Sequence, residues 1–193
     1  MDIDTPHGPA RAHVQPVDNG VGMLVLGHGA GGGVSAPDLM VVTRVALESQ
    51  VSVALVEQPY LVAGRKSQAP AAQLDAAWIA AVDRLREDGL PLIVGGRSAG
   101  ARGACRTAAT AGAAAVLCLA FPVHPPGKPE KSRLDELDAV KVPVLVVQGE
   151  RDPFGKPPRG PRNRTVVAVP GDHSLKADLD AVEAAVRAWL ARL

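Results

Sequence analysis

A serine framed by two glycines lies in the middle of the chain, in the segment GGRSAG at residues 95–100. Gly96, Ser98 and Gly100 form the pattern G-x-S-x-G, which is typical of a serine held on a sharp turn between a strand and a helix. The small neighbours let the backbone adopt this strained turn and let the helix pass close to the strand. A simple turn in which Ser98 caps the helix explains the same residues.

Two residues further along the chain are the partners that a nucleophilic serine needs. Asp152 lies in QGERDPFG and His173 in PGDHSLK, so the order along the chain is Ser, Asp, His. An imidazole can take the serine proton, and a carboxylate can hold that imidazole in the correct tautomer. Ser98, Asp152 and His173 are therefore predicted to form a catalytic triad. Taken singly, Asp152 is also explained as a turn residue and His173 as an exposed loop residue.

Two other carboxylates compete with Asp152 as the partner of His173. Glu150 lies closer to the preceding predicted strand, and Asp172 is next to His173 in the chain. A carboxylate attached to the neighbouring residue does not reach around the ring easily. Asp152 is therefore the preferred partner.

The glycine-rich segment HGAGGG at residues 28–33 follows the first predicted strand. Its glycines let backbone amides point at a ligand without obstruction by side chains. The amides of Ala30 and Ala99 are predicted to form an oxyanion hole for the oxygen that becomes negative during acyl transfer. His28 is expected to order this loop by hydrogen bonding rather than to act as a base.

Nucleotide binding is the alternative function for the same segment. Gly27, Gly29 and Gly32 satisfy G-x-G-x-x-G after a strand, and Glu57 ends the next strand, where an acid that binds ribose could lie. However, the glycine-rich loop continues past the point where a dinucleotide-binding helix should begin. The pattern G-x-x-x-x-G-K-[ST] of a P-loop is absent.

Short apolar runs alternate along the chain with longer segments of helical spacing. The predicted strands are residues 21–27, 51–57, 91–95, 114–120, 144–148 and 165–169. The predicted helices are residues 36–50, 71–88, 98–111 and 176–193, with a shorter one at 133–139. This order predicts an α/β fold: a mostly parallel twisted sheet with helices on both faces. An antiparallel edge strand is expected near residues 12–17.

The predicted sheet explains how residues far apart in the sequence come together. Ser98, Asp152 and His173 each follow a predicted strand. The carboxyl ends of parallel strands meet at one edge of a sheet, which is where such folds place their chemistry. The three side chains are therefore expected at the same edge.

Length and composition restrict the remaining possibilities. The chain has 193 residues, of which 47% are hydrophobic and 21% charged, which is expected of a single domain spanning residues 1–193. Residues 1–20 are interpreted as an N-terminal extension or edge strand. The net charge of +1 and the 3% of aromatic residues argue against nucleic acid and against an anionic membrane as partners.

No segment is apolar enough to predict a transmembrane helix, and the N-terminus lacks the order of a secretory signal. A cytoplasmic protein is therefore expected. Cys105 and Cys118 lack the spacing of metal ligands and are interpreted as small buried hydrophobic residues, so no metal site is predicted. The oligomeric state does not follow from the sequence.

With these motifs in place, the sequence resembles the α/β-hydrolase superfamily from about residue 21 to residue 193. It is similar to a small, lid-poor branch related to dienelactone hydrolases and to testis-expressed hydrolase-like proteins. The motifs that carry this similarity are LGHGAGG, EQPY, GGRSAGAR, FPVHPPGKPEK, VQGERDPFG and PGDHSLK.

The resemblance implies a triad of Ser98, Asp152 and His173, and an oxyanion hole at Ala30 and Ala99. It implies hydrolysis of an ester, thioester or related acyl bond without a cofactor. Dienelactone hydrolases use Cys where this chain has Ser98, so their substrate is not carried over. Because related proteins include hydrolase-like domains of chromatin-regulatory complexes, a catalytically idle interaction module is the alternative function.

Five residues near the predicted site are candidates for contacts with a small-molecule acyl substrate: His28, Tyr60, Arg97, His124 and Lys128. Lys128 could supply a cationic contact, although its segment is also explained as a rigid surface turn. Arg97 could favour an anionic acyl group or anchor neighbouring loops, and anchoring is the preferred interpretation. Only residues 121–143 separate two predicted strands where many relatives insert a lid, so an open, shallow pocket is expected.

Overall fold

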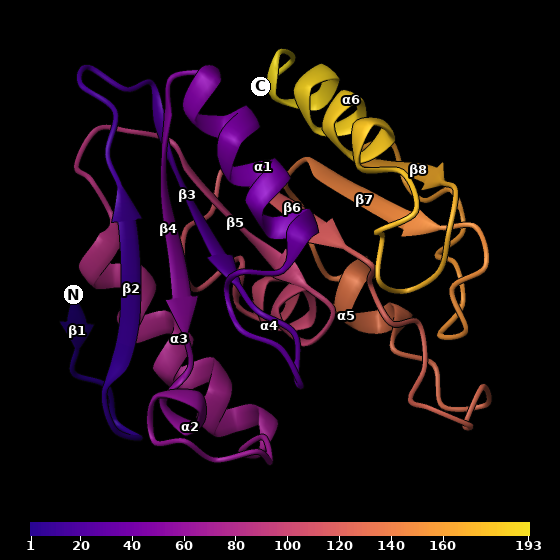
Figure 1. Ribbon diagram of the computed structural model, residues 1–193, viewed down its shortest axis with the longest axis horizontal. Helices are drawn as coiled ribbons and strands as arrows, with labels where there is room; N and C mark the ends of the chain where they lie inside the picture. The colour runs from indigo at the N-terminus through magenta and orange to yellow at the C-terminus, as the bar shows by residue number, and fades with distance from the viewer.

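The computed structural model describes residues 1–193 and contains one sheet of eight strands in the order β1-β2-β4-β3-β5-β6-β7-β8 (Figure 1). The strands are β1 (Asp2–Ile3), β2 (Ala10–Gln15), β3 (Gly22–Gly27), β4 (Val51–Glu57), β5 (Leu92–Arg97), β6 (Ala115–Leu119), β7 (Val144–Gly149) and β8 (Arg164–Val169). β1 and β2 pair antiparallel with their neighbours, and all pairs from β4 to β8 are parallel. The predicted α/β fold class is confirmed.

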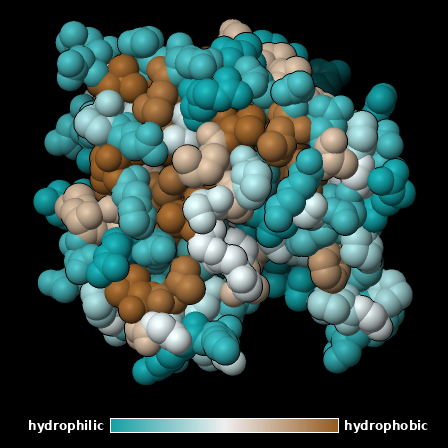
Figure 2. Space-filling model, viewed as in Figure 1, coloured by the Kyte–Doolittle hydropathy of each residue, from teal (hydrophilic) through white to brown (hydrophobic).

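Helices cover both faces of the sheet. They are α1 (Pro37–Glu48), α2 (Pro59–Val62), α3 (Ala71–Leu85), α4 (Ala99–Thr107), α5 (Leu134–Asp138) and α6 (Leu179–Leu190). In Figure 1, α1 and α6 lie side by side in front of the sheet, whereas α3 and α4 lie behind it. In Figure 2 the front face is largely hydrophilic, with hydrophobic residues in several separate groups.

Two apolar layers fill the space between the sheet and its helices. Leu24 and Leu26 of β3 pack in the layer of α1 and α6, whereas Val25 between them packs in the layer of α3 and α4. Successive side chains of a strand point to opposite faces, so a strand buried on both faces must be apolar throughout. Burying each of these side chains contributes about 1.5–3 kcal/mol. The layers therefore hold the strand ends in fixed register.

The boundaries of several elements differ from the sequence-based prediction. β5 continues to Arg97, because Gly96 pairs with Cys118 and Arg97 with Leu119 at the edge of the sheet. α4 ends at Thr107, and a turn containing Gly112 with φ +60° closes the following segment. The antiparallel strand expected near residues 12–17 is β2, and the two-residue strand β1 forms the edge instead.

The segment between β6 and β7 contains only loops and the short helix α5, so the fold has no large lid. Figure 2 shows a notch at the lower edge of the molecule. The carboxyl ends of β3 and β4 point toward that edge in Figure 1.

None of the helices combines the length and hydropathy needed to cross a membrane.

Candidate active site

Ser98 occupies the turn between β5 and α4 in a backbone conformation that side chains rarely adopt. Its φ is 53° and its ψ is −108°. Its amide donates a hydrogen bond of 2.9 Å to the carbonyl of Leu119, and its carbonyl accepts one of 3.1 Å from the amide of Arg102. Although Ser98 precedes α4, its hydroxyl makes no capping bond to the helix. The surrounding structure thus holds a strained turn in which the hydroxyl is not used to cap the helix.

The two glycines of the motif are required by the end of β3. A Cβ atom on Gly100 would lie 2.5 Å from the carbonyl oxygen of Gly27, and one on Gly96 would lie closer still to the same oxygen. Real Cβ contacts essentially never come this close. Gly27, which also begins the pattern G-x-G-x-x-G, therefore packs against the serine turn. The alternative of nucleotide binding would need a helix at the start of this loop, but α1 begins only at Pro37.

The structure predicts opposite effects for two glycines of α4. Gly100→Ala is expected to lower the free energy of unfolding by about 3 kcal/mol, because the new methyl group meets rigid backbone. Gly103→Ala is the matched control, since its new Cβ would have no atom closer than 3.8 Å. That change is expected to stabilise the helix by up to about 1 kcal/mol. Chemical denaturation of both variants measures the difference, and equal effects would contradict the packing explanation.

His173 and Asp152 lie in line with Ser98. His173 Nε2 is 2.9 Å from Ser98 Oγ, and His173 Nδ1 is 2.8 Å from Asp152 Oδ2. Asp152 follows β7 and His173 follows β8, so neighbouring strands deliver them to one edge. The Asp152 side chain is fully buried, whereas 17% of the His173 side chain is exposed. The structure thus brings together the three residues predicted as a triad.

The competing carboxylates have other environments. Glu150 is exposed. Asp172 Oδ1 accepts hydrogen bonds from the amide and the hydroxyl of Ser174, at 2.9 and 2.7 Å. These bonds hold the pKa of Asp172 below its usual value. Asp172 therefore shapes the turn that carries His173 but does not contact its ring.

Two residues beside Asp152 and His173 were not found from the sequence. Gln148, at the end of β7, donates from Nε2 to Asp152 Oδ2 at 2.7 Å. The Phe154 ring packs edge-on against the His173 ring, with centroids 4.5 Å apart. The amide of Phe154 also donates to Asp152 Oδ1 at 2.8 Å. The only sequence signal for Gln148 is a lone amide side chain at the end of an apolar strand.

The predicted oxyanion donors come from the start of a helix and from a loop. Ala99 is the first residue of α4, and Ala30 lies in the glycine-rich loop after β3. Neither the backbone amide of Ala30 nor that of Ala99 donates to a backbone carbonyl in a turn, a loop or a helix cap. Free amides at the start of a helix favour a negative ligand. The Tyr60 hydroxyl donates to the Ala30 carbonyl at 3.1 Å and thereby holds the loop.

His28 connects this loop to the segment after β4. Its Nδ1 lies 2.8 Å from the Gly29 carbonyl, and its Nε2 lies 3.1 Å from the amide of Gln58. Because the backbone N–H of Gln58 can only donate, His28 Nε2 must accept and His28 Nδ1 must carry the proton. Burial lowers the pKa of His28, which favours this neutral ring. His28 and Tyr60, both candidates for substrate contacts, are thus engaged in holding the loop.

Arg97 links three parts of the site. Its Nε lies 2.9 Å from Asp38 Oδ2 at the start of α1, and its Nη2 donates to the His173 carbonyl at 2.9 Å. Asp38 is fully buried, and burial raises its pKa, which the Arg97 charge opposes. Through these contacts Arg97 connects the serine turn to α1 and to the turn that carries His173.

Arg97→Met is expected to cost about 3 kcal/mol of stability, because it leaves the buried Asp38 carboxylate without its counter-ion. Adding Asp38→Asn removes that charge, so the double variant is expected to be more stable than Arg97→Met alone. Urea unfolding of both variants and of Asp38→Asn gives the coupling energy. Simple additivity of the two changes would argue against a coupled ion pair.

The remaining candidates for substrate contacts lie on the loop after β6. His124 is half-buried, and its Nδ1 lies 3.0 Å from the Pro125 carbonyl. Its ring also faces Gly155, on the turn that follows Asp152. Lys128 is exposed, and its side chain makes no hydrogen bond or ion pair with the triad. The structure therefore brings His124, but not Lys128, next to the turn that follows Asp152.

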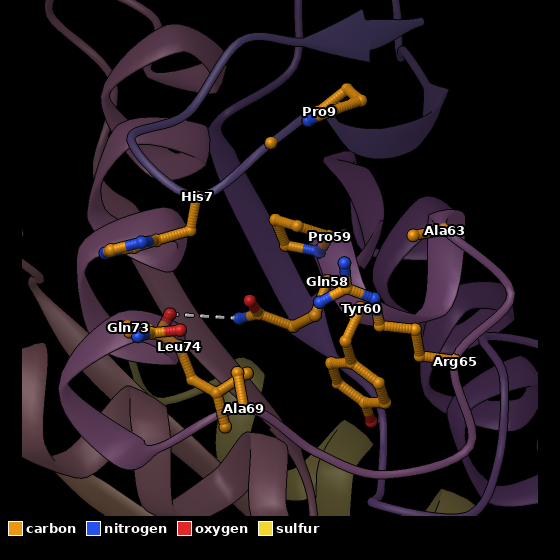
Figure 3. Close-up of a pocket in the computed structure, with 11 residues that line it drawn as sticks. His7, Pro9, Gln58, Pro59, Tyr60, Ala63, Arg65, Ala69, Gln73 and Leu74 are labelled. Carbon is orange, nitrogen blue, oxygen red and sulfur yellow. Dashed lines mark hydrogen bonds between the residues drawn. The ribbon is translucent and has the colours of Figure 1, made fainter.

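A cavity of about 180 Å³ lies beside Tyr60 (Figure 3). Gln58, Pro59 and Tyr60 line one part of it, and Figure 3 shows the Arg65 side chain extending over Tyr60. Neither Ser98 nor His173 lines this cavity.

No cluster of three or more His, Cys, Asp or Glu side chains is arranged to hold a metal ion.

The comparison with family models agrees with the architecture. The model described as "Alpha/beta hydrolase domain" matches residues 21–183. This range begins one residue before β3 and ends within α6, so it includes the whole site. No curated protein matches the chain.

Several solved structures share the fold at low sequence identity. A lid-less α/β serine hydrolase from Xanthomonas campestris is 20% identical with a TM-score of 0.80, over 100% of this chain and 93% of that one. Est1E from Butyrivibrio proteoclasticus, with ferulic acid bound, is 18% identical with a TM-score of 0.78, over 100% and 98%. A dienelactone hydrolase from Anabaena variabilis is 18% identical with a TM-score of 0.77, over 100% and 95%.

Proposed function

The chain belongs to the alpha/beta hydrolase family, and from this membership and the geometry of the site we propose that it is a serine hydrolase that cleaves a small ester, thioester or related acyl bond. The family and the fold support hydrolase activity. The observation that carries the finer proposal is the hydrogen-bonded line from Ser98 through His173 to Asp152. A neutral serine becomes a nucleophile only beside such a base.

In the first half of the reaction, Ser98 Oγ attacks the acyl carbon while His173 Nε2 accepts the serine proton. Asp152 stays ionised and stabilises the imidazolium that forms. His173 then gives its proton to the leaving group as the bond to the acyl carbon breaks. The product of this half is an acyl group attached to Ser98.

In the second half, water replaces the alcohol or thiol. His173 removes a proton from water, and the hydroxide attacks the acyl carbon. The bond to Ser98 Oγ breaks and the serine regains its proton from His173. The amides of Ala30 and Ala99 bind the negative oxygen in both halves, and each such donor is worth roughly a hundredfold or more in rate.

The surroundings of Ser98 favour small or extended substrates over long lipids. The segment at residues 121–143 forms no large lid, and the site lies at the carboxyl ends of the strands. The proposal requires no cofactor, because every step uses a side chain or amide of the chain itself. Since Est1E binds ferulic acid on the same fold, esters of aromatic acids belong in the first substrate screen.

Labelling with a fluorophosphonate tests the proposal without knowledge of the substrate. Such a probe reacts with an activated serine, and we expect one adduct per folded chain, mapped to Ser98 by peptide mass analysis. Thermally unfolded protein is the control and should remain unlabelled. An unreactive folded protein would contradict the proposal and favour an interaction module built on the hydrolase fold.

A further inference from the structure

Gln148 is a fully buried polar side chain at the centre of the site, four residues before Asp152. It is the penultimate residue of β7, a strand whose other side chains are all apolar. None of the steps described above uses it. Burying an amide among apolar strands is costly unless its polar atoms are paired, so its contacts indicate what it does there.

The amide nitrogen of Gln148 faces three acceptors. Nε2 lies 2.7 Å from Asp152 Oδ2, 2.9 Å from the Gly155 carbonyl and 3.1 Å from the Phe121 carbonyl. The amide oxygen is buried and has no partner. The opposite orientation of the amide would place that oxygen against three other oxygens. The contacts therefore determine that Gln148 donates toward Asp152.

Asp152 depends on these donors because its side chain has no contact with water. Its Oδ1 accepts from the Phe154 amide, and its Oδ2 accepts from both Gln148 and His173. A buried carboxylate remains charged only when donors replace the lost water. Gln148 is the one side chain besides His173 that supplies a donor to Oδ2.

We propose that Gln148 is a positioning residue that aims Asp152 Oδ2 at His173 and tunes how strongly the carboxylate holds the proton of the histidine. This inference rests on the proposed serine hydrolase function. A neutral amide suits this role, because a cation would cancel the charge that stabilises the imidazolium, and an apolar side chain would leave Oδ2 with His173 alone. The contacts to Phe121 and Gly155 fix the amide itself between β6 and the turn after β7.

Gln148→Met tests this role because it removes both N–H donors at similar volume. We expect the rate of fluorophosphonate labelling to fall about tenfold to a hundredfold, as for small misplacements of catalytic groups. Without the positive end of the amide dipole, Asp152 holds the histidine proton more strongly. The acid limb of the rate against pH should therefore move to higher pH by about half a unit or more.

Ser52→Ala is the matched control. The Ser52 hydroxyl is also buried and accepts a hydrogen bond of 3.1 Å from the Val17 amide, at the opposite end of the sheet. Its loss should cost stability but change neither the labelling rate nor the acid limb. If Gln148→Met labels at the wild-type rate, or loses rate with an unmoved acid limb, the positioning role is wrong. A wild-type protein that does not label contradicts the proposed function itself, so the two failures are distinct.

Gln148→Glu provides a second variant of the same shape, in case Gln148→Met does not fold. When protonated, its carboxyl group can donate one bond to Asp152, and when ionised it places a second negative charge beside Oδ2. The second negative charge strengthens the hold of Asp152 on the histidine proton, so the acid limb should move to higher pH, as for Gln148→Met. An unmoved acid limb would overturn the proposal.

Discussion

Ser98→Ala is expected to abolish covalent labelling and to lower kcat/KM for any acyl substrate by about 10³-fold or more. The reason is that no other hydroxyl lies within hydrogen-bond distance of His173 Nε2. His173→Ala should have an effect of similar size, because it leaves Ser98 without a base. Intact-mass analysis after labelling, together with initial rates on activated esters, measures both variants.

The double variant gives a sharper test of the same prediction. Residues that act as one unit are not additive, so Ser98→Ala combined with His173→Ala should be no slower than the slower single variant. Ser52→Ala removes a hydroxyl far from the site and should keep the wild-type rate. Labelling of Ser98→Ala at the wild-type level, or multiplicative losses in the double variant, would argue against a triad.

Asp152→Asn is expected to lower kcat by about 10⁴-fold while leaving the fold intact. The environment of the side chain makes the amide unfavourable in either orientation. With its NH₂ at the Oδ2 position it meets the donors Gln148 and His173, and with its NH₂ at the Oδ1 position it meets the Phe154 amide. In the first orientation His173 must accept at Nδ1, so Nε2 carries a proton and cannot receive that of Ser98.

Glu150→Gln is the matched control for this change, since it replaces an exposed carboxylate two residues earlier by the same amide. It should leave kcat unchanged. Steady-state rates of both variants test this prediction, with circular dichroism used to compare them at equal folded fraction. A loss of less than tenfold in Asp152→Asn, or an equal loss in Glu150→Gln, would assign the orienting carboxylate to another residue.

The order of strands in the sheet was beyond sequence-based prediction, although the strands themselves were not. The parallel strands are visible in the sequence as apolar runs, because burial on both faces requires apolar side chains. The sequence contains no comparable signal for which strands pair, so the pairing of β2 with β4 rather than with β3 follows only from the fold. The two residues of β1 are too few to form a pattern. Element ends shifted where local contacts, such as those of Gly96 in β5, extended a strand.

Loop residues show most clearly where prediction from spacing stops. His28, Tyr60 and Arg97 were candidates for substrate contacts, although ordering of the loop was expected for His28 and anchoring was preferred for Arg97. The structure shows them bonded to Gly29, Ala30 and Asp38. Which of two polar groups a side chain meets depends on the packing of separate loops, and sequence spacing carries no information about that packing.

By itself, the sequence determined the α/β class, the strained serine turn and the order Ser98, Asp152, His173, because each depends on local residue types and on the rule that parallel strands end at one edge. Only the tertiary structure showed the contact of Asp152 with His173, and only it placed Gln148 within hydrogen-bond distance of Asp152. Those contacts depend on distances between the ends of different strands. Such distances are set by the packing of the two apolar layers around the sheet.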